Sequence, residues 1–351
     1  MAKERPAKSL GRRVAIVGGD SLLARELRDL LREAEPAPAI ELISAASENA
    51  SVLALGVESG EEEALALSPL TAASFAGASV AFLAGSLASS RKAARLNPPR
   101  GPVLIDLTGA LEDQPQARLR APSTETGETG GAVNASSIQV VAHPAAIAIA
   151  ILLAALSRRT TIRRSLVHVF EPASERGQKG LDELQQQTIA TLNFRKLPTD
   201  VFDAQLSFNM LARYGEEAVE PLDGIEQRIE KHVASLLSAH PAVPMPSLRV
   251  IQAPVFHGHS FSLWVEFAEN PGVKALGEIL EEAGIDVRPD DPPSNALIAG
   301  QSGLSAGAIA VDSNQPRAAW IWAVADNFRL AAENAVAAAR PFLTDAQEPR
   351  Q

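Results

Sequence analysis

The chain has 351 residues, of which 46% are hydrophobic and 21% charged, so it is globular and long enough to form two hydrophobic cores. Its formal net charge of −10 argues against non-specific binding to nucleic acid or to an anionic membrane, because both need a positive protein surface. The longest apolar run, residues 145–156, is far shorter than the roughly 20 residues that span a bilayer. We therefore expect no nucleic-acid partner and no membrane partner.

The amino-terminal segment and the cysteine content bear on the compartment. Residues 1–11 are basic and polar, with no apolar stretch behind them, so we expect a disordered N-terminus and no secretory signal. The chain contains no cysteine, which excludes disulfides, thiolate zinc sites and thiol nucleophiles. These features fit a reducing compartment, and we expect a cytoplasmic protein.

The first part of the chain alternates strand and helix patterns. An apolar run at residues 14–17 ends at Gly18, and leucines then recur at helical spacing from Leu22, which indicates strand, tight turn and helix. Further short buried strands are expected at residues 40–45, 80–84 and 103–107. This alternation predicts an α/β fold with a parallel sheet covered on both faces. Residues 121–137 lack apolar periodicity and are expected to form a mobile loop.

A different pattern begins at Pro144. This proline suits the first turn of a helix, and residues 145–156 are apolar on nearly every face, so the helix is expected to be buried. Longer, alternating strands are expected at residues 166–170, 248–256, 260–267 and 320–325. These features are typical of an α+β domain. An alanine-rich helix is expected over residues 327–342.

The turn after the first strand stands where a dinucleotide fold holds pyrophosphate on amide groups at a helix N-terminus. Its pattern is Gly18-x-x-Ser21-x-x-Ala24, so two of the three glycines of the fingerprint are absent. Two interpretations stay open. Either Gly18, Ser21 and Leu22 bind NADP or NAD, or the turn is purely structural.

Distinct motifs follow one another along almost the whole chain. They lie at residues 14–24, 105–106 (Ile-Asp), 141–144 (Val-Ala-His-Pro), 177–184, 207–209 (Ser-Phe-Asn), 253–260 (Ala-Pro-Val-Phe-His-Gly-His-Ser) and 324–329 (Val-Ala-Asp-Asn-Phe-Arg). In this order they resemble the aspartate-semialdehyde dehydrogenase family. The last two segments are the most specific.

The resemblance implies both an architecture and a reaction. The architecture is a Rossmann-type dinucleotide-binding domain over residues 12–143, completed by a C-terminal helix over residues 326–345, and an α+β catalytic-type domain over residues 144–325 that dimerises. The implied reaction is the NADP-dependent reductive dephosphorylation of aspartyl phosphate. In that chemistry a cysteine forms a thioester while a histidine acts as acid and base.

The site residues that the resemblance implies are only partly present. His259 stands at the acid/base position, but Ala146 stands at the cysteine position and carries no nucleophilic atom. Glu171 replaces the glutamine that helps to hold the intermediate. Gln252 replaces the arginine that grips the substrate carboxylate, a loss of ~1.5–3 kcal/mol.

Other positions change the anion and coenzyme contacts. By the same resemblance, Glu112 replaces a phosphate-binding arginine, and Asn49 replaces the arginine that reads the 2′-phosphate of NADP. Asn327 either touches a nicotinamide or caps the final helix, and both interpretations stay open. His257 and His259 would share one face of a strand, but no carboxylate pattern accompanies them, and we expect no metal.

These losses favour one hypothesis over two rivals. In the first, the chain is a family homologue that is catalytically inactive for this reaction and acts as a binding or regulatory homodimer. In the second, it is a dinucleotide-dependent oxidoreductase of altered chemistry that uses His259 with Glu171 or His143. In the third, it forms a heteromer with an active homologue.

Overall fold

The computed structural model describes residues 12–45, 51–56, 62–125 and 138–343. Within them the chain forms two compact units, one made of residues 12–120, 138–141 and 332–343 and the other of residues 121–125 and 142–331. The expectations for residues 1–11, for Asn49 and for most of the 121–137 loop lie outside the described residues.

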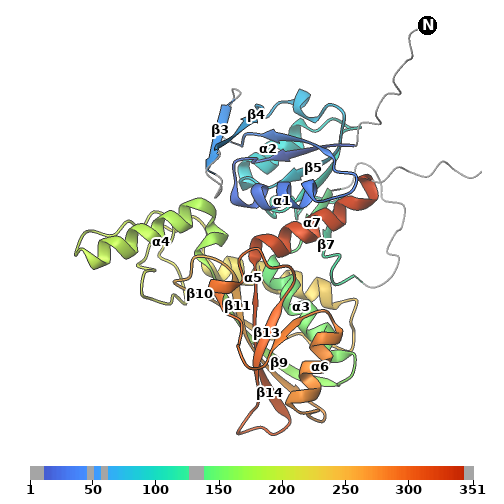
Figure 1. Cartoon of the computed structure of the whole chain (residues 1–351), viewed down its shortest axis with the longest axis vertical. Helices are drawn as coiled ribbons and strands as arrows, with labels where there is room; N and C mark the ends of the chain where they lie inside the picture. The colour runs from blue at the N-terminus through green and yellow to red at the C-terminus, as the bar shows by residue number, and fades with distance from the viewer. Residues whose placement is uncertain (1–11, 46–50, 57–61, 126–137, 344–351) are drawn as a thin grey trace, which may run out of the picture. The chain divides into compact units, whose positions relative to one another are not determined.

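The first unit is built on a parallel six-stranded sheet in the order β2-β1-β5-β6-β8-β7. Figure 1 labels β5 and β7 of this sheet, with α1 and α2 of the same unit. Its strands are β1 (Arg13–Val17), β2 (Ala39–Ile43), β5 (Ala78–Leu83), β6 (Val103–Asp106), β7 (Ala117–Arg120) and β8 (Ile138–Val141). Its other elements are α1 (Leu22–Arg32), the hairpin β3 (Ser51–Gly56) and β4 (Glu62–Leu67), η1 (Ala72–Phe75) and α2 (Leu87–Leu96). The parallel sheet confirms the predicted Rossmann-type fold.

The turn between β1 and α1 is set by backbone crowding and by a cap. Gly18 has φ +83°, and a Cβ there would lie 2.3 Å from the Cα of Gly85, so no other residue fits without a shift of backbone. Ser21 caps α1, because its Oγ accepts the N–H of Ala24 at 3.0 Å.

The second unit is a mixed six-stranded sheet in the order β10-β9-β11-β14-β13-β12. Its strands are β9 (Ile162–Glu171), β10 (Ser247–Gln252), β11 (His259–Phe267), β12 (Asp286–Arg288), β13 (Ser305–Val311) and β14 (Ala318–Ala325). Its helices are α3 (Pro144–Ser157), η2 (Ala173–Arg176), α4 (Gly177–Leu192), α5 (Leu222–Leu237), α6 (Val273–Glu282) and η3 (Asn295–Leu297). Together they form the predicted α+β domain.

The core of the second unit follows the apolar patterns. α3 packs against α5, α6 and β9 and is buried on nearly every face, as predicted. In β11, the predicted inward row Phe261, Leu263, Val265 and Phe267 is at most 1% exposed. Among the described residues, no helix is both long and apolar enough to cross a membrane.

Two predicted boundaries differ from the structure. The strand expected over residues 248–256 ends at Gln252, because Pro254 has no N–H with which to continue the ladder. The carbonyls of Val255 and Phe256 instead accept the N–H groups of Ala173 and Ser174. The final helix, α7 (Asn327–Leu343), begins in the second unit, and its residues from 332 onward belong to the first.

Candidate functional site

A cluster of histidines and carboxylates lies inside the second unit, where the ends of several elements meet. Its members come from the cap of α3, the end of β9, η2, the start of β11 and the start of α7, and they are His143, Glu171, Glu175, Arg176, His257, His259, Asp326 and Asn327. All except Glu175, Arg176 and His257 are at most 7% exposed. The cluster is therefore held in the interior by the ends of regular elements.

A chain of ion pairs neutralises the buried carboxylate of Glu171. Its Oε1 lies 2.8 Å from Nη2 of Arg176, whose Nη1 bonds to Glu220. Arg228 pairs with the other oxygen of Glu220 at 3.3 Å. Burial raises the pKa of Glu171, and Arg176 opposes that shift. Burial would lower the pKa of Arg176, but the surrounding carboxylates, Glu171 first, raise it on balance, so the guanidinium stays charged.

His143 and His259 face the carboxylate of Glu175. Their ring centroids are 5.7 Å apart, and Nδ1 of His143 accepts the N–H of Ala145 at 3.2 Å. In the neutral ring the proton therefore lies on Nε2. This atom is 3.7 Å from Oε2 of Glu175, and Nε2 of His259 is 3.9 Å from Oε1. Both distances exceed a hydrogen bond.

Burial keeps both rings neutral near pH 7. It lowers the pKa of His259 to about 4, although the carboxylate of Glu171 opposes the shift. Burial, assisted by Arg228, also lowers the pKa of His143 well below its ordinary value. The pKa of Glu175 is raised, again mainly by burial. The cluster therefore disfavours charge at its centre.

Several buried polar atoms of the cluster have no hydrogen-bond partner among the described residues. They are Nε2 of His143, both ring nitrogens of His259, Oε2 of Glu171 and Nε of Arg176. A buried polar atom without a partner costs ~1–3 kcal/mol. Such a concentration in one place is typical of a site that holds a polar molecule or ordered water.

Both polar atoms of the Gln252 side chain are hydrogen-bonded within the protein. Its Nε2 donates to the backbone carbonyls of Glu171 at 2.8 Å and Ala253 at 3.1 Å, and its Oε1 accepts the hydroxyl of Tyr214. Both N–H groups are thus used within the protein. The side chain has no donor left for a ligand carboxylate.

Asn327 links three segments, and Asp326 caps α7. Oδ1 of Asn327 accepts the N–H of Gly258 at 3.1 Å, and its Nδ2 donates to Glu175 at 2.8 Å. Oδ1 of Asp326 accepts the N–H of Arg329 at 2.9 Å, which is the capping bond. The capping interpretation of Asn327 is therefore wrong, because its amide is occupied elsewhere.

The two histidines of the His-x-His motif do not share a strand face. β11 begins at His259, and Gly258, with φ +81°, turns the chain before it. Nε2 of His257 lies 2.9 Å from Asp326, while the ring of His259 lies against His143. The described part of the chain contains no group of three or more side chains suited to a metal ion.

The glycine turn of the first unit has few free donors. The N–H groups of Gly18 and Gly19 both donate to the carbonyl of Ile43, at 2.9 and 3.0 Å, and the Ser21 hydroxyl serves as the cap. The amides of Leu22 and Leu23, which every helix leaves unbonded in its first turn, remain for a phosphate. The turn therefore has fewer backbone donors to offer a phosphate than its position in the fold suggests.

Comparison with known proteins agrees with this fold. The family model described as the semialdehyde dehydrogenase dimerisation domain matches residues 153–330. The chain belongs to the aspartate-semialdehyde dehydrogenase family. It is 30% identical over 332 residues to a USG-1 protein homolog of Pseudomonas aeruginosa, covering 92% of this chain and 95% of that protein. It is 26% identical over 329 residues to the aspartate-semialdehyde dehydrogenase of Rickettsia bellii, covering 90% and 93%.

Solved structures show the same family fold. A probable aspartate-semialdehyde dehydrogenase from Pseudomonas aeruginosa superposes with a TM-score of 0.80 at 27% identity, covering 95% of this chain and 98% of that one. The aspartate-semialdehyde dehydrogenase of Candida albicans, solved with NADP, has a TM-score of 0.64 at 14% identity, covering 95% and 98%. The second likeness concerns the fold alone.

The structure brings most of the predicted site residues together. Ala146 lies in the first turn of α3, is fully buried, and follows the His143 cap whose ring faces His259. Glu171 and Gln252 are paired in the register of β9 and β10. Glu112 lies instead in the first unit, where its charge contributes to the raised pKa of Asp106 after the larger effect of burial.

Sequence reasoning missed the charged partners that organise the cluster. Glu175 and Arg176 lie in η2, which follows β9 after one residue, and their only signal is a charged pair a few residues beyond a buried strand. Glu220 and Arg228 are distant in sequence from Glu171, and in the sequence Arg228 looks like an ordinary cation on the exposed face of a helix. Their role appears only when β9, η2 and α5 are brought together.

Proposed function

We propose that this member of the aspartate-semialdehyde dehydrogenase family does not catalyse the family reaction and acts as a binding protein. The observation that carries the proposal is Ala146, at the position to which the family resemblance assigns the nucleophile. Its methyl group is fully buried in the first turn of α3, and the chain has no cysteine to take its place. Thioester formation therefore has no thiol available.

Two further substitutions support the loss of the reaction. Glu171, at the glutamine position, is a buried carboxylate that already has a protein cation, Arg176. Gln252, at the arginine position, uses its donors on backbone carbonyls. An anionic substrate would therefore meet no guanidinium at position 252, and at position 171 it would meet a carboxylate where the family resemblance implies a neutral glutamine.

The unpartnered atoms suggest what the cluster would bind. Oε2 of Glu171 can only accept a hydrogen bond, whereas the Nε2–H of His143 can only donate one. A neutral or cationic polar group that both donates and accepts would satisfy them. We therefore assign the cluster to a small polar ligand without an anionic group.

The Ala146→Cys variant tests whether the missing thiol alone, or also the substitutions at Gln252 and Glu171, prevents the family reaction. We expect both the natural protein and this variant to stay below about one turnover per second, the low end for enzymes, in phosphate-dependent reduction of NADP with aspartate semialdehyde. The thiol alone does not restore a carboxylate clamp at Gln252. Ala146→Ser is the matched control, of similar size but without a thiolate.

Turnover above that rate would contradict the proposal. In the natural protein it would show that another group replaces the thiol. In the Ala146→Cys variant alone, it would show that Gln252 and Glu171 do not hinder the reaction.

A second candidate function is an oxidoreductase of altered chemistry on the same scaffold. It is favoured by His259, whose neutral ring faces Glu175 and His143 with no hydrogen bond of its own among the described residues. It requires a dinucleotide, for which the glycine turn offers the amides of Leu22 and Leu23. Calorimetric titration separates the two functions: no binding of NAD or NADP at millimolar concentration removes this candidate.

We propose a homodimer as the working form. The matched dimerisation domain supports it, as do exposed apolar side chains at the end of α4 and in the segments after it. These side chains are Ile189, Leu192, Phe194, Phe208 and Met210. Light scattering checks the mass, and co-purification with a cysteine-containing relative would instead favour the heteromer. The cysteine-free composition supports a cytoplasmic location.

A further inference from the structure

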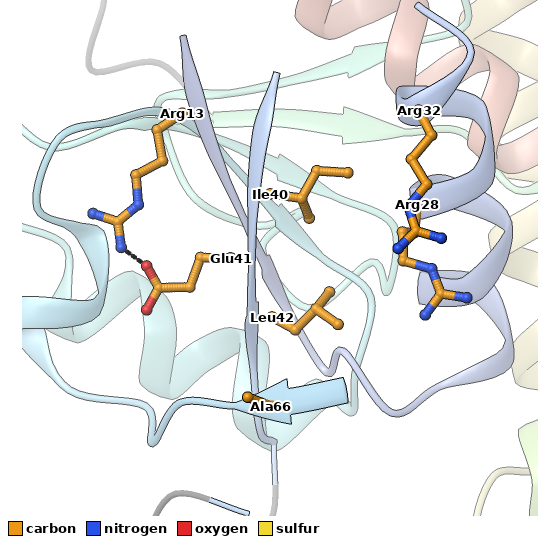
Figure 2. A pocket seen from close by; sticks show the side chains of 7 residues that line it. All are labelled: Arg13, Arg28, Arg32, Ile40, Glu41, Leu42 and Ala66. Carbon is orange, nitrogen blue, oxygen red and sulfur yellow. Dashed lines mark ion pairs between the residues drawn. The ribbon is translucent and has the colours of Figure 1, made fainter. Parts of the chain in front are cut away.

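A cavity at the edge of the first unit's sheet is rich in arginine. Its volume is about 410 Å³, within the range of small-ligand pockets. It is lined by Arg13, Arg28, Arg32, Ile40, Glu41, Leu42 and Ala66. Figure 2 shows Arg13 paired with Glu41 on one side of β2, and Arg28 and Arg32 of α1 on the other. The cavity thus combines an apolar floor with two further cations, in a chain whose net charge is −10.

The side chain of Arg28 is buried with few polar partners, which costs folding free energy. Its side chain is only 8% exposed, and its one described ion pair joins Nε to the adjacent Asp29 at 3.6 Å, a carboxylate that is 48% exposed. Nε has no hydrogen-bond partner among the described residues. A buried guanidinium nitrogen without a hydrogen bond is destabilising. Its retention in the wall of a cavity points to a ligand that pairs with it.

Arg28 and Arg32 are four residues apart on α1, so their side chains lie on one face of the helix. We propose that this cavity binds a small organic dianion, with its anionic groups on Arg28 and Arg32 and its apolar part on Ile40 and Leu42. A phosphate ester and a dicarboxylate share this chemistry, because planar guanidinium groups bind both in bidentate fashion.

The cavity is separate from the coenzyme turn. Arg28 lies seven residues beyond the Ser21 cap, which is about 10 Å along the helix axis. Arg13 is the first residue of β1, whereas Gly18 follows its last residue. The cavity therefore extends toward the amino ends of the strands, and the turn lies at their carboxyl ends.

Calorimetry with succinate and with inorganic phosphate tests the proposal on the full chain. We expect at least one of them to bind, and the Arg28→Met variant to bind it about tenfold to hundredfold more weakly, as loss of a charge-assisted bond predicts. Arg32→Gln, at an exposed position, should also weaken binding. Arg25→Gln, on an exposed part of α1 outside the cavity lining, should leave affinity unchanged.

The thermal stability of the ligand-free protein separates a binding role from a structural one. If Arg28 is kept for a ligand, Arg28→Met melts at the same or a higher temperature, because it removes a buried charge whose described ion pair, with Asp29, is long and partly exposed. A lower melting temperature, unchanged affinity in both variants, or no binding of either probe would overturn the proposal. So would competition between the bound probe and NADP, since it would place the anion at the coenzyme.

Discussion

Arg176→Met lowers the free energy of unfolding by about 3–5 kcal/mol, the cost of removing one partner from a buried ion pair. The substitution leaves the fully buried carboxylate of Glu171 without its cation and removes one of two partners of Glu220. Methionine is chosen because it preserves the packing of the aliphatic stem. Urea unfolding followed by circular dichroism measures the change.

The control for this variant is Arg164→Met. Arg164 also pairs with a buried carboxylate, Glu266, but its own side chain is 69% exposed, so we expect a loss of at most ~1 kcal/mol. Equal losses of unfolding free energy in the two variants would contradict the prediction that the buried Glu171–Arg176 pair contributes more than the exposed one. Adding Glu171→Gln to Arg176→Met should recover part of the loss, because no buried charge is then left unpaired.

His259→Gln changes how stability depends on pH. The pKa of His259 is about 4 in the folded protein and about 6.5 in the unfolded chain, so only the unfolded state takes up its proton between these values. The contribution of this residue to stability is therefore complete above pH 6.5 and falls as the pH approaches 4. The difference amounts to about 3 kcal/mol.

The stability of the natural protein must be compared with that of the variant, because neighbouring groups also change the pH dependence of stability. The raised pKa values of Glu171 and Glu175 act in the opposite sense, since the folded state binds their protons more tightly and gains stability as the pH falls. The charged and titratable groups that surround His259 are His143, Glu171, Glu175, Arg176, His257 and Asp326. We expect the stability of the natural protein relative to the variant to fall by about 3 kcal/mol between pH 7 and pH 4. Parallel profiles would contradict this.

Elements with strong apolar patterns could be predicted from the sequence. α3 and β11 are examples, because burial on one or all faces leaves a clear periodicity. β7 was not predicted, since this edge strand of sequence Ala-Arg-Leu-Arg is partly exposed and has no buried face to set a pattern. Edge strands need less apolar surface, so sequence periodicity fails there first.

For the site, the positions of several residues could be predicted from the sequence, but their bonding partners could not. The family resemblance identified His259, Glu171 and Gln252, because the sequence motifs around them give each its position along the chain. It could not show that Gln252 bonds to two carbonyls, or that Glu171 pairs with Arg176. Hydrogen-bond partners depend on tertiary contacts that periodicity does not encode.

The bonds of Gln252 bear on the evolutionary history of the site. An arginine restored at this position would leave the carbonyls of Glu171 and Ala253 and the hydroxyl of Tyr214 to find new partners in the interior. Reversion by a single mutation would therefore destabilise the protein before it improved substrate binding. In the proposed function, where Gln252 stands in place of a substrate-binding arginine, these hydrogen bonds oppose a return to arginine in one step, and recovery of the reaction would need several coordinated changes.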